Sequence, residues 1–130
     1  MATFEYRLAF HQPKSGAAAL DLPAAPAPVY VMATPYLTAS DFVGASLIEG
    51  TLSARLTPGG REKINEIGNT NAAAKRLEDY VGLLLYLNGK PEKTYTLVCE
   101  PLPGYDLEVR GMDAERLRSL ASAIGAARAL

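Results

Sequence analysis

The feature that most constrains the fold is an apolar run that ends in a hairpin turn. Residues 81–87 are VGLLLYL, and Asn88-Gly89 follows directly. A continuous apolar run of this length is typical of a strand that is covered on both faces. Asn-Gly favours a two-residue type I′ turn, because both central residues of that turn take a positive φ. The run therefore predicts a central strand, and we expect residues 93–100 to return antiparallel to it.

Other segments also show strand patterns. Residues 3–10 alternate apolar and polar side chains with a period of two, as a half-buried strand does. Shorter strand-like segments occupy residues 29–33, 46–57 and 106–112, and Gly50 is expected to mark a bulge or turn within the second of them.

Two segments carry the signals of a helix start. Thr57-Pro58 combines an N-cap residue with a proline at the first helical position, where no amide donor is needed. Asp113 precedes a C-terminal segment whose apolar side chains recur at helical spacing. We expect Gly68-Asn69 to interrupt the first helix, with residues 71–80 continuing it, and a shorter helical turn within residues 37–45.

The order of these elements predicts the fold class. From residue 46 onward it is strand, helix, three strands and helix, which favours an α+β fold: an antiparallel sheet with two main helices packed on one face, ferredoxin-like. Residues 11–28 are rich in proline and alanine, which predicts a linker with one helical turn near residues 17–20. We therefore expect an N-terminal strand and linker at residues 1–28, and the α+β domain at residues 29–130.

Composition argues against several functions. The formal net charge of -1 does not suit a nucleic-acid partner, which needs a surplus of basic side chains. One cysteine, Cys99, and one histidine, His11, are too few for a disulfide or a transition-metal site, so we expect no metal or other cofactor. We expect Cys99 to be buried and His11 to lie on the surface. No apolar run is long enough to span a bilayer, and the first residues lack the pattern of a secretion leader, which leaves the compartment open.

The sequence contains no recognised catalytic motif. There is no Gly-x-Ser-x-Gly, and the Gly59-Gly60 pair lacks the spacing and the Lys-Ser/Thr of a phosphate loop. We interpret Gly59-Gly60 as part of a helix start, with weak anion binding there as the alternative. We predict no catalytic residues and a protein that is not an enzyme.

Several short motifs, taken in order, resemble a known family. They are the Leu-Thr-x-x-Gly helix start at residues 56–60, the Thr70-Asn71 pair, the apolar strand ending in Asn88-Gly89-Lys90, and a glycine-containing strand that leads into the C-terminal helix. This series resembles the head subdomain in the first periplasmic domain of SecD, the accessory subunit of the preprotein translocase. The sequence departs from that family by having Asn88 in place of an aspartate and a longer region around the first helix.

The resemblance implies a module without catalytic residues that contacts a protein or peptide. It implies a periplasmic or cell-envelope location, with a cytoplasmic one left open. It also places candidate partner-binding residues at Thr70, Asn71, Asn88, Gly89 and Lys90.

Other functions stay open at the level of sequence. A small-ligand carrier or an enzyme could use a pocket lined by tyrosines: Tyr30, Tyr36, Tyr80, Tyr86, Tyr95 and Tyr105. An antidote that inhibits a toxin is a further alternative. A homodimer could form if residues 3–10 pair with the sheet of a second chain.

Overall fold

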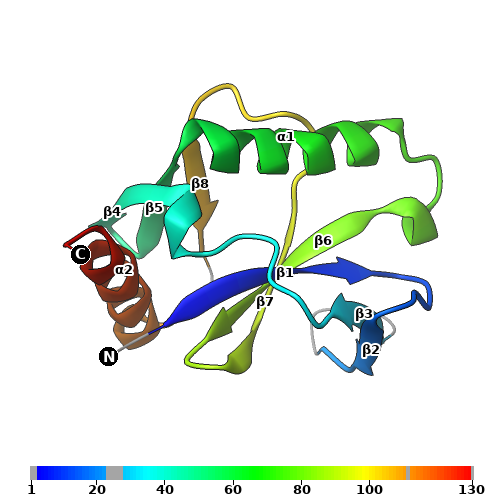
Figure 1. The fold of residues 1–130 in the computed structure, drawn as a ribbon, viewed down its shortest axis with the longest axis horizontal. Coiled ribbons are helices and arrows are strands. Elements are labelled where there is room, and N and C mark those ends of the chain that lie inside the picture. Colours follow the sequence, from blue (N-terminus) through cyan, green and yellow to red (C-terminus); the bar gives the residue numbers. More distant parts are fainter. Residues whose placement is uncertain (1–2, 23–27, 111, 130) are drawn as a thin grey trace.

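Antiparallel strands and two long helices make up the fold (Figure 1). The computed structural model of the chain describes residues 3–22, 28–110 and 112–129. The strands are β1 (Phe4–Phe10), β2 (Ala17–Leu20), β3 (Val29–Met32), β4 (Phe42–Ile48), β5 (Thr51–Leu56), β6 (Val81–Leu87), β7 (Lys90–Leu97) and β8 (Asp106–Val109). The helices are α1 (Pro58–Ala73) and α2 (Ala114–Ala129), with short 3₁₀ turns η1 (Ala39–Asp41) and η2 (Leu77–Asp79).

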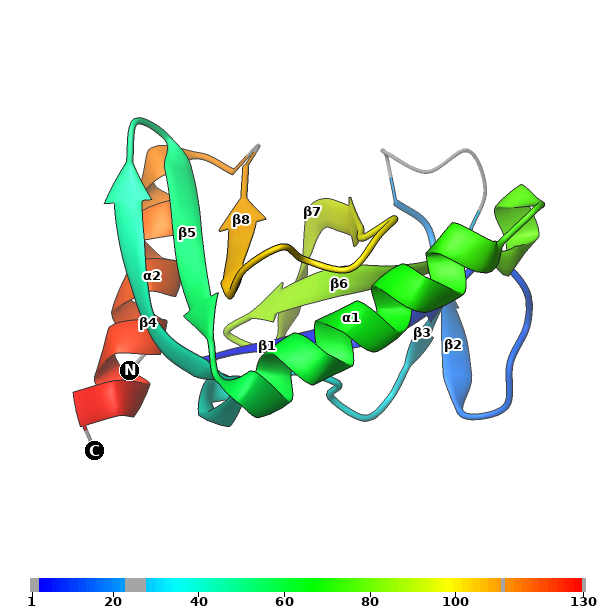
Figure 2. The same cartoon turned by 90° about the horizontal axis from the view of Figure 1, so that it is seen from above.

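The strands form two sheets. One has five strands in the order β2-β3-β1-β6-β7, and the other has three in the order β4-β5-β8. Every strand pairing is antiparallel. The predicted α+β class, with antiparallel strands and two main helices, is confirmed. The order of elements along the chain does not reveal the division into two sheets. In Figure 2, α1 extends from the three-stranded sheet along the five-stranded one, and α2 lies against β4.

Strand β1, which the sequence assigned to a segment separate from the domain, is the middle strand of the five-stranded sheet. It pairs with β6 from Phe4 opposite Leu87 to Phe10 opposite Val81. The side chains of Phe4 and Tyr6 are buried in the main core. The N-terminal strand is therefore part of the domain's own packing.

Strand β6 is covered on both faces, as its continuous apolar sequence predicted. Leu83 and Leu85 lie in the main core with side chains from α1 and α2, whereas Leu84 lies in a smaller core on the other face. The turn that follows has φ values of 54° at Asn88 and 79° at Gly89, in agreement with the predicted positive φ at both positions.

Helix α1 begins as predicted but does not break. The Thr57 hydroxyl accepts a 3.0 Å hydrogen bond from the amide of Gly60, and Pro58 is the first helical residue. The predicted interruption at Gly68-Asn69 is wrong, because the helix runs on to Ala73. Gly68 instead allows close approach, since a Cβ there would lie 2.6 Å from the backbone carbonyl of Glu100. The glycine serves packing rather than helix termination.

Three local expectations need correction. Residues 17–20 form β2 rather than a helical turn, because β3 supplies a partner for their backbone groups. The helical turn expected within residues 37–45 is limited to η1, and Gly44 lies beyond it in β4. Cys99 is exposed rather than buried. It follows the buried Val98, and successive side chains of an extended chain point to opposite sides.

Candidate functional site

The candidate partner-binding residues do not form one cluster. Thr70 and Asn71 lie in the last turns of α1, where Asn71 bonds to Val81 at the start of β6. Asn88, Gly89 and Lys90 lie at the opposite end of β6. A strand of seven residues spans about 20 Å at roughly 3.3 Å per residue, so the two groups belong to different surfaces.

Asn71 is a buried structural residue. Its exposed fraction is 2%, and its amide nitrogen donates to the carbonyl oxygens of Val81 and Val98, each at 2.8 Å. Its amide oxygen accepts a 2.8 Å hydrogen bond from the backbone amide of Val81. The side chain joins the end of α1 to β6 and to the residue after β7, which leaves it no group to offer a partner. The neighbouring Thr70 is exposed, and its hydroxyl donates to the carbonyl oxygen of Glu66.

The hairpin residues lie on an exposed surface. Asn88 holds the start of the chain against the hairpin, because its side-chain oxygen accepts from the amide of Thr3 at 3.0 Å and its own amide donates to the Thr3 carbonyl at 2.8 Å. The side chain of Lys90 is exposed. Asn88 and Lys90 also line a groove.

This groove, which we name the hairpin–helix groove, lies between the β6–β7 hairpin and the first turns of α2. Its volume is about 620 Å³. It is lined by Leu87, Asn88, Lys90, Pro91, Glu92, Asp113, Glu115, Arg116 and Ser119. Two positive and three negative side chains face it, so it presents charges of both signs.

An ion pair between the exposed Arg116 and the buried Glu92 lines the groove. The Glu92 carboxylate, in a residue only 8% exposed, accepts a 2.8 Å hydrogen bond from the Arg116 guanidinium. Asp113 caps α2 as predicted, because its carboxylate accepts from the amide of Arg116 at 2.8 Å. Glu92 and Arg116 were not among the candidate residues predicted from the sequence; they are 24 residues apart and meet only through the fold. No sequence signal pointed to the pair, because Glu92 lies outside the strand expected at residues 93–100 and its burial arises only in the fold.

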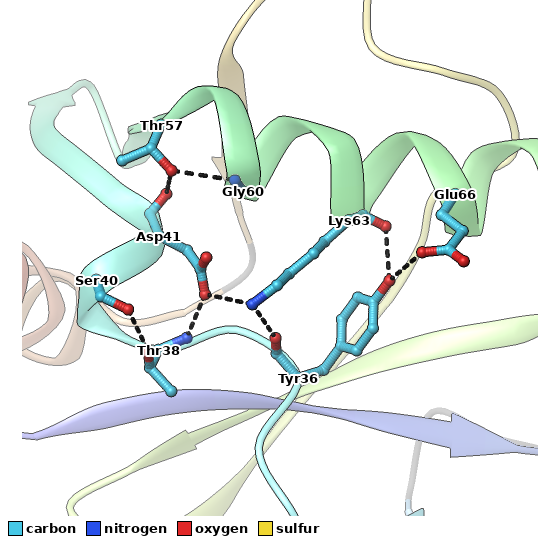
Figure 3. A network of polar contacts seen from close by, with 8 residues as sticks. All are labelled: Tyr36, Thr38, Ser40, Asp41, Thr57, Gly60, Lys63 and Glu66. Atoms are coloured by element: carbon cyan, nitrogen blue, oxygen red, sulfur yellow. Dashed lines mark hydrogen bonds and ion pairs between the residues drawn. The ribbon is translucent and has the colours of Figure 1, made fainter.

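A second polar network ties the segment before β4 to α1 (Figure 3). The buried Asp41 carboxylate accepts from the amide of Thr38 at 3.0 Å and from the Lys63 ammonium at 3.2 Å. The Tyr36 hydroxyl donates to the Lys63 carbonyl at 2.9 Å. Burial, followed by the charge of Glu66, raises the pKa of Tyr36 to about 12. Each of these polar groups has a hydrogen-bond or ion-pair partner within the network, so the network holds the segment before β4 against α1.

Four of the six tyrosines considered as a pocket lining take part in contacts at different places in the fold. Tyr36 belongs to the network of Figure 3, and the Tyr95 hydroxyl bonds to the His11 ring at 2.8 Å. The ring of Tyr86 lies under Arg7 at 4.1 Å, whereas that of Tyr105 lies under Arg61 at 4.8 Å. These four tyrosines therefore serve four separate contacts.

Among the described residues, no group of three or more His, Cys, Asp or Glu side chains is placed to hold a metal ion. No helix within the described ranges is both long and apolar enough to cross a bilayer.

Comparison with known proteins identifies a structural relative. No model of a known protein family matches the sequence, and no curated protein matches it. A solved structure, described as the crystal structure of SecDF in its super-membrane-facing form, aligns with 95% of this chain at a TM-score of 0.62 and 16% sequence identity. The aligned region covers 18% of the SecDF chain. At this identity the match shows the fold alone, so the chain has a SecD-like fold and spans about a fifth of the length of the protein that it resembles.

Proposed function

We propose that this domain is a non-catalytic protein-binding module, and that it takes an extended segment of another polypeptide into the hairpin–helix groove. The SecD-like fold supports a protein partner, because the SecD resemblance implies a module that contacts polypeptide. The same resemblance supports a location in the cell envelope, as the periplasmic head subdomain has. Translocation itself is not part of the proposal.

The observation that carries this proposal is the polar and charged lining of the groove. Small-molecule sites are mostly apolar and enclose the ligand, with a few convergent polar groups. The hairpin–helix groove is instead lined mainly by polar and charged side chains from two elements. A polypeptide offers amide groups and side chains of either charge. It therefore complements a groove that is lined by Lys90 from the hairpin and by Glu115 from α2.

Groove-filling variants test the proposal. Ser119 lines the groove and is half-buried, so Ser119→Trp should occupy it. Ser122→Trp is the matched control, because Ser122 is exposed on the same helix and does not line the groove. Binding is measured by fluorescence anisotropy with a set of short labelled peptides that covers acidic, basic, mixed-charge and apolar sequences. We expect mixed-charge peptides to bind, and Ser119→Trp to weaken that binding by about tenfold or more, equivalent to about 1.4 kcal/mol.

A crosslinking experiment extends the test to natural partners. A photoreactive side chain at position 90 lies at the groove, whereas one at Lys75 lies beyond the end of α1 and serves as the control. Position 90 should give crosslinked protein in cell-envelope extracts, and Ser119→Trp should abolish it. Failure of every peptide to bind, together with equal crosslinking at the two positions, contradicts the proposal.

A further inference from the structure

Strand β4 presents an exposed and uncharged sheet edge. It is the outer strand of the three-stranded sheet, and its sequence, FVGASLI, contains no charged residue and no proline. Three of its side chains are large, apolar and exposed: Val43 at 42%, Leu47 at 38% and Ile48 at 67%. Proteins usually protect a free edge with charges or proline, because its unpaired backbone groups pair readily with another strand. This edge has a bulge between Phe42 and Gly44, and residues 44–48 lack such protection.

The hairpin geometry identifies the backbone groups that are free. Ile48 pairs with Thr51 across the two-residue turn at Glu49-Gly50, whose φ values are 49° and 79°. In a hairpin of this kind the flanking residues exchange both hydrogen bonds, and the bonded pairs then alternate along the ladder. Ser46 and Gly44 therefore also bond toward β5. Ala45 and Leu47 direct their N–H and C=O groups toward the free edge.

We propose that two copies of this chain associate through β4, in antiparallel register about a two-fold axis at Ser46. In this register Ala45 of each copy lies opposite Leu47 of the other, so the free backbone groups meet as hydrogen-bonded pairs. The two three-stranded sheets become one continuous six-stranded sheet. A two-fold axis makes the contact self-complementary and closed, which limits assembly to a dimer.

The side chains on the outer face fit this register. Gly44 lies opposite Ile48 of the second copy, and no atom lies within 4 Å of the position that a Cβ at Gly44 would take. A hollow of about 450 Å³ surrounds Gly44, with Ser46 and Ser53 among its lining residues. The exposed Ile48 of each copy enters the hollow of the other. Pairing therefore removes the most exposed large apolar side chain of the described residues from water.

The charges also favour a second copy as the occupant. Because β4 is uncharged, two β4 strands meet without repulsion between like charges. Arg55 is the neighbour of Gly44 on β5, and Glu49 directly follows Ile48. The proposed register thus brings Arg55 of one copy, which also pairs with Asp106 of its own chain at 3.8 Å, toward Glu49 of the other copy at each end of the pairing.

This dimer is independent of the proposed binding function. The β4 edge belongs to the three-stranded sheet, whereas the hairpin–helix groove is lined by residues of the β6–β7 hairpin and of α2. It also differs from a dimer formed by exchange of β1. The failure of either proposal leaves the other standing.

Cysteine crosslinking tests the register. In a Cys99→Ser background, Ser46→Cys places two thiols opposite each other in a pair without backbone hydrogen bonds, where the Cα atoms are about 4.5 Å apart. A disulfide accepts Cα separations of about 4.4–6.8 Å. Ser53→Cys is the matched control: Ser53 pairs with Ser46 from β5, so three strand spacings, about 14 Å, separate the two copies of Ser53.

We expect the Cys99→Ser protein to be a dimer by light scattering, and Ser46→Cys to crosslink about tenfold faster than Ser53→Cys under mild oxidation. Ile48→Lys changes an exposed side chain and should shift the protein to monomer without loss of the folded circular-dichroism spectrum. A monomer at all concentrations overturns the proposal. So does a dimer in which Ser46→Cys crosslinks no faster than Ser53→Cys, because another surface must then hold it together.

Discussion

Replacing Asn71 distinguishes a structural residue from a partner-binding one. Asn71→Ala removes three hydrogen bonds and leaves two carbonyl oxygens and one amide at partly or fully buried positions. Each lost hydrogen bond costs about 1 kcal/mol net, and more where the remaining group is cut off from water. Alanine recovers about 0.5 kcal/mol of helix propensity. We expect the free energy of unfolding to fall by about 2–3 kcal/mol.

Urea unfolding followed by circular dichroism measures this change. Asn69→Ala is the matched control, because Asn69 lies in the same helix and is exposed. It should change the stability by about 0.5 kcal/mol or less, as surface substitutions usually do. Peptide binding by folded Asn71→Ala protein should equal that of the unmodified protein. The structural interpretation fails if Asn71→Ala is as stable as Asn69→Ala and loses binding instead.

Three further outcomes are expected. Gly68→Ala should lower the free energy of unfolding by about 1–3 kcal/mol, because the added Cβ overlaps the backbone of the loop after β7. Gly125→Ala is the control and should not lower it, because nothing lies within 4 Å of the Cβ position there. Thermal unfolding compares the two variants. The exposed Cys99 should react with a thiol reagent in native buffer as fast as in urea, and protection in native buffer contradicts the structure. Burial raises the pKa of Tyr36 and Tyr95 from 10 to about 12, so the unfolded chain loses these protons first. The contribution of the two protonated tyrosines to the free energy of unfolding is therefore complete below pH 10 and is lost as the pH rises toward about 12. Urea unfolding across this range should show the decline, and Tyr95→Phe should reduce it.

Local signals along the chain predicted the boundaries of several elements. Thr57-Pro58 and Asp113 mark helix starts because a cap and its helix are adjacent in sequence. Asn88-Gly89 marks a turn for a similar reason, since φ is a property of each residue. The low helix propensity of Gly68 predicted a break in α1, but the helix continues, and the glycine allows close contact between α1 and the backbone of Glu100.

Which residues come together at the candidate site depended more on long-range contacts than the boundaries of the helices and turns did. Asn71 was predicted to face a partner, but its bonding groups belong to residues 10 and 27 positions away. Asn88 and Lys90 do line a groove, yet Arg116, which bonds to Glu92 in its wall, comes from the last helix. No periodicity or motif relates these residues, since their proximity arises only when α2 packs near the hairpin.

The sequence by itself determined the α+β class, the buried strand β6, the type I′ turn and the helix starts, because each depends on side-chain periodicity or backbone preference over a few neighbouring residues. Tertiary structure alone decided that the strands divide into two sheets, that β1 lies in the middle of one, and that β4 is left as an uncharged edge in the other. Strand pairing depends on which apolar surfaces meet when distant segments bury their side chains together, and no local pattern records that choice.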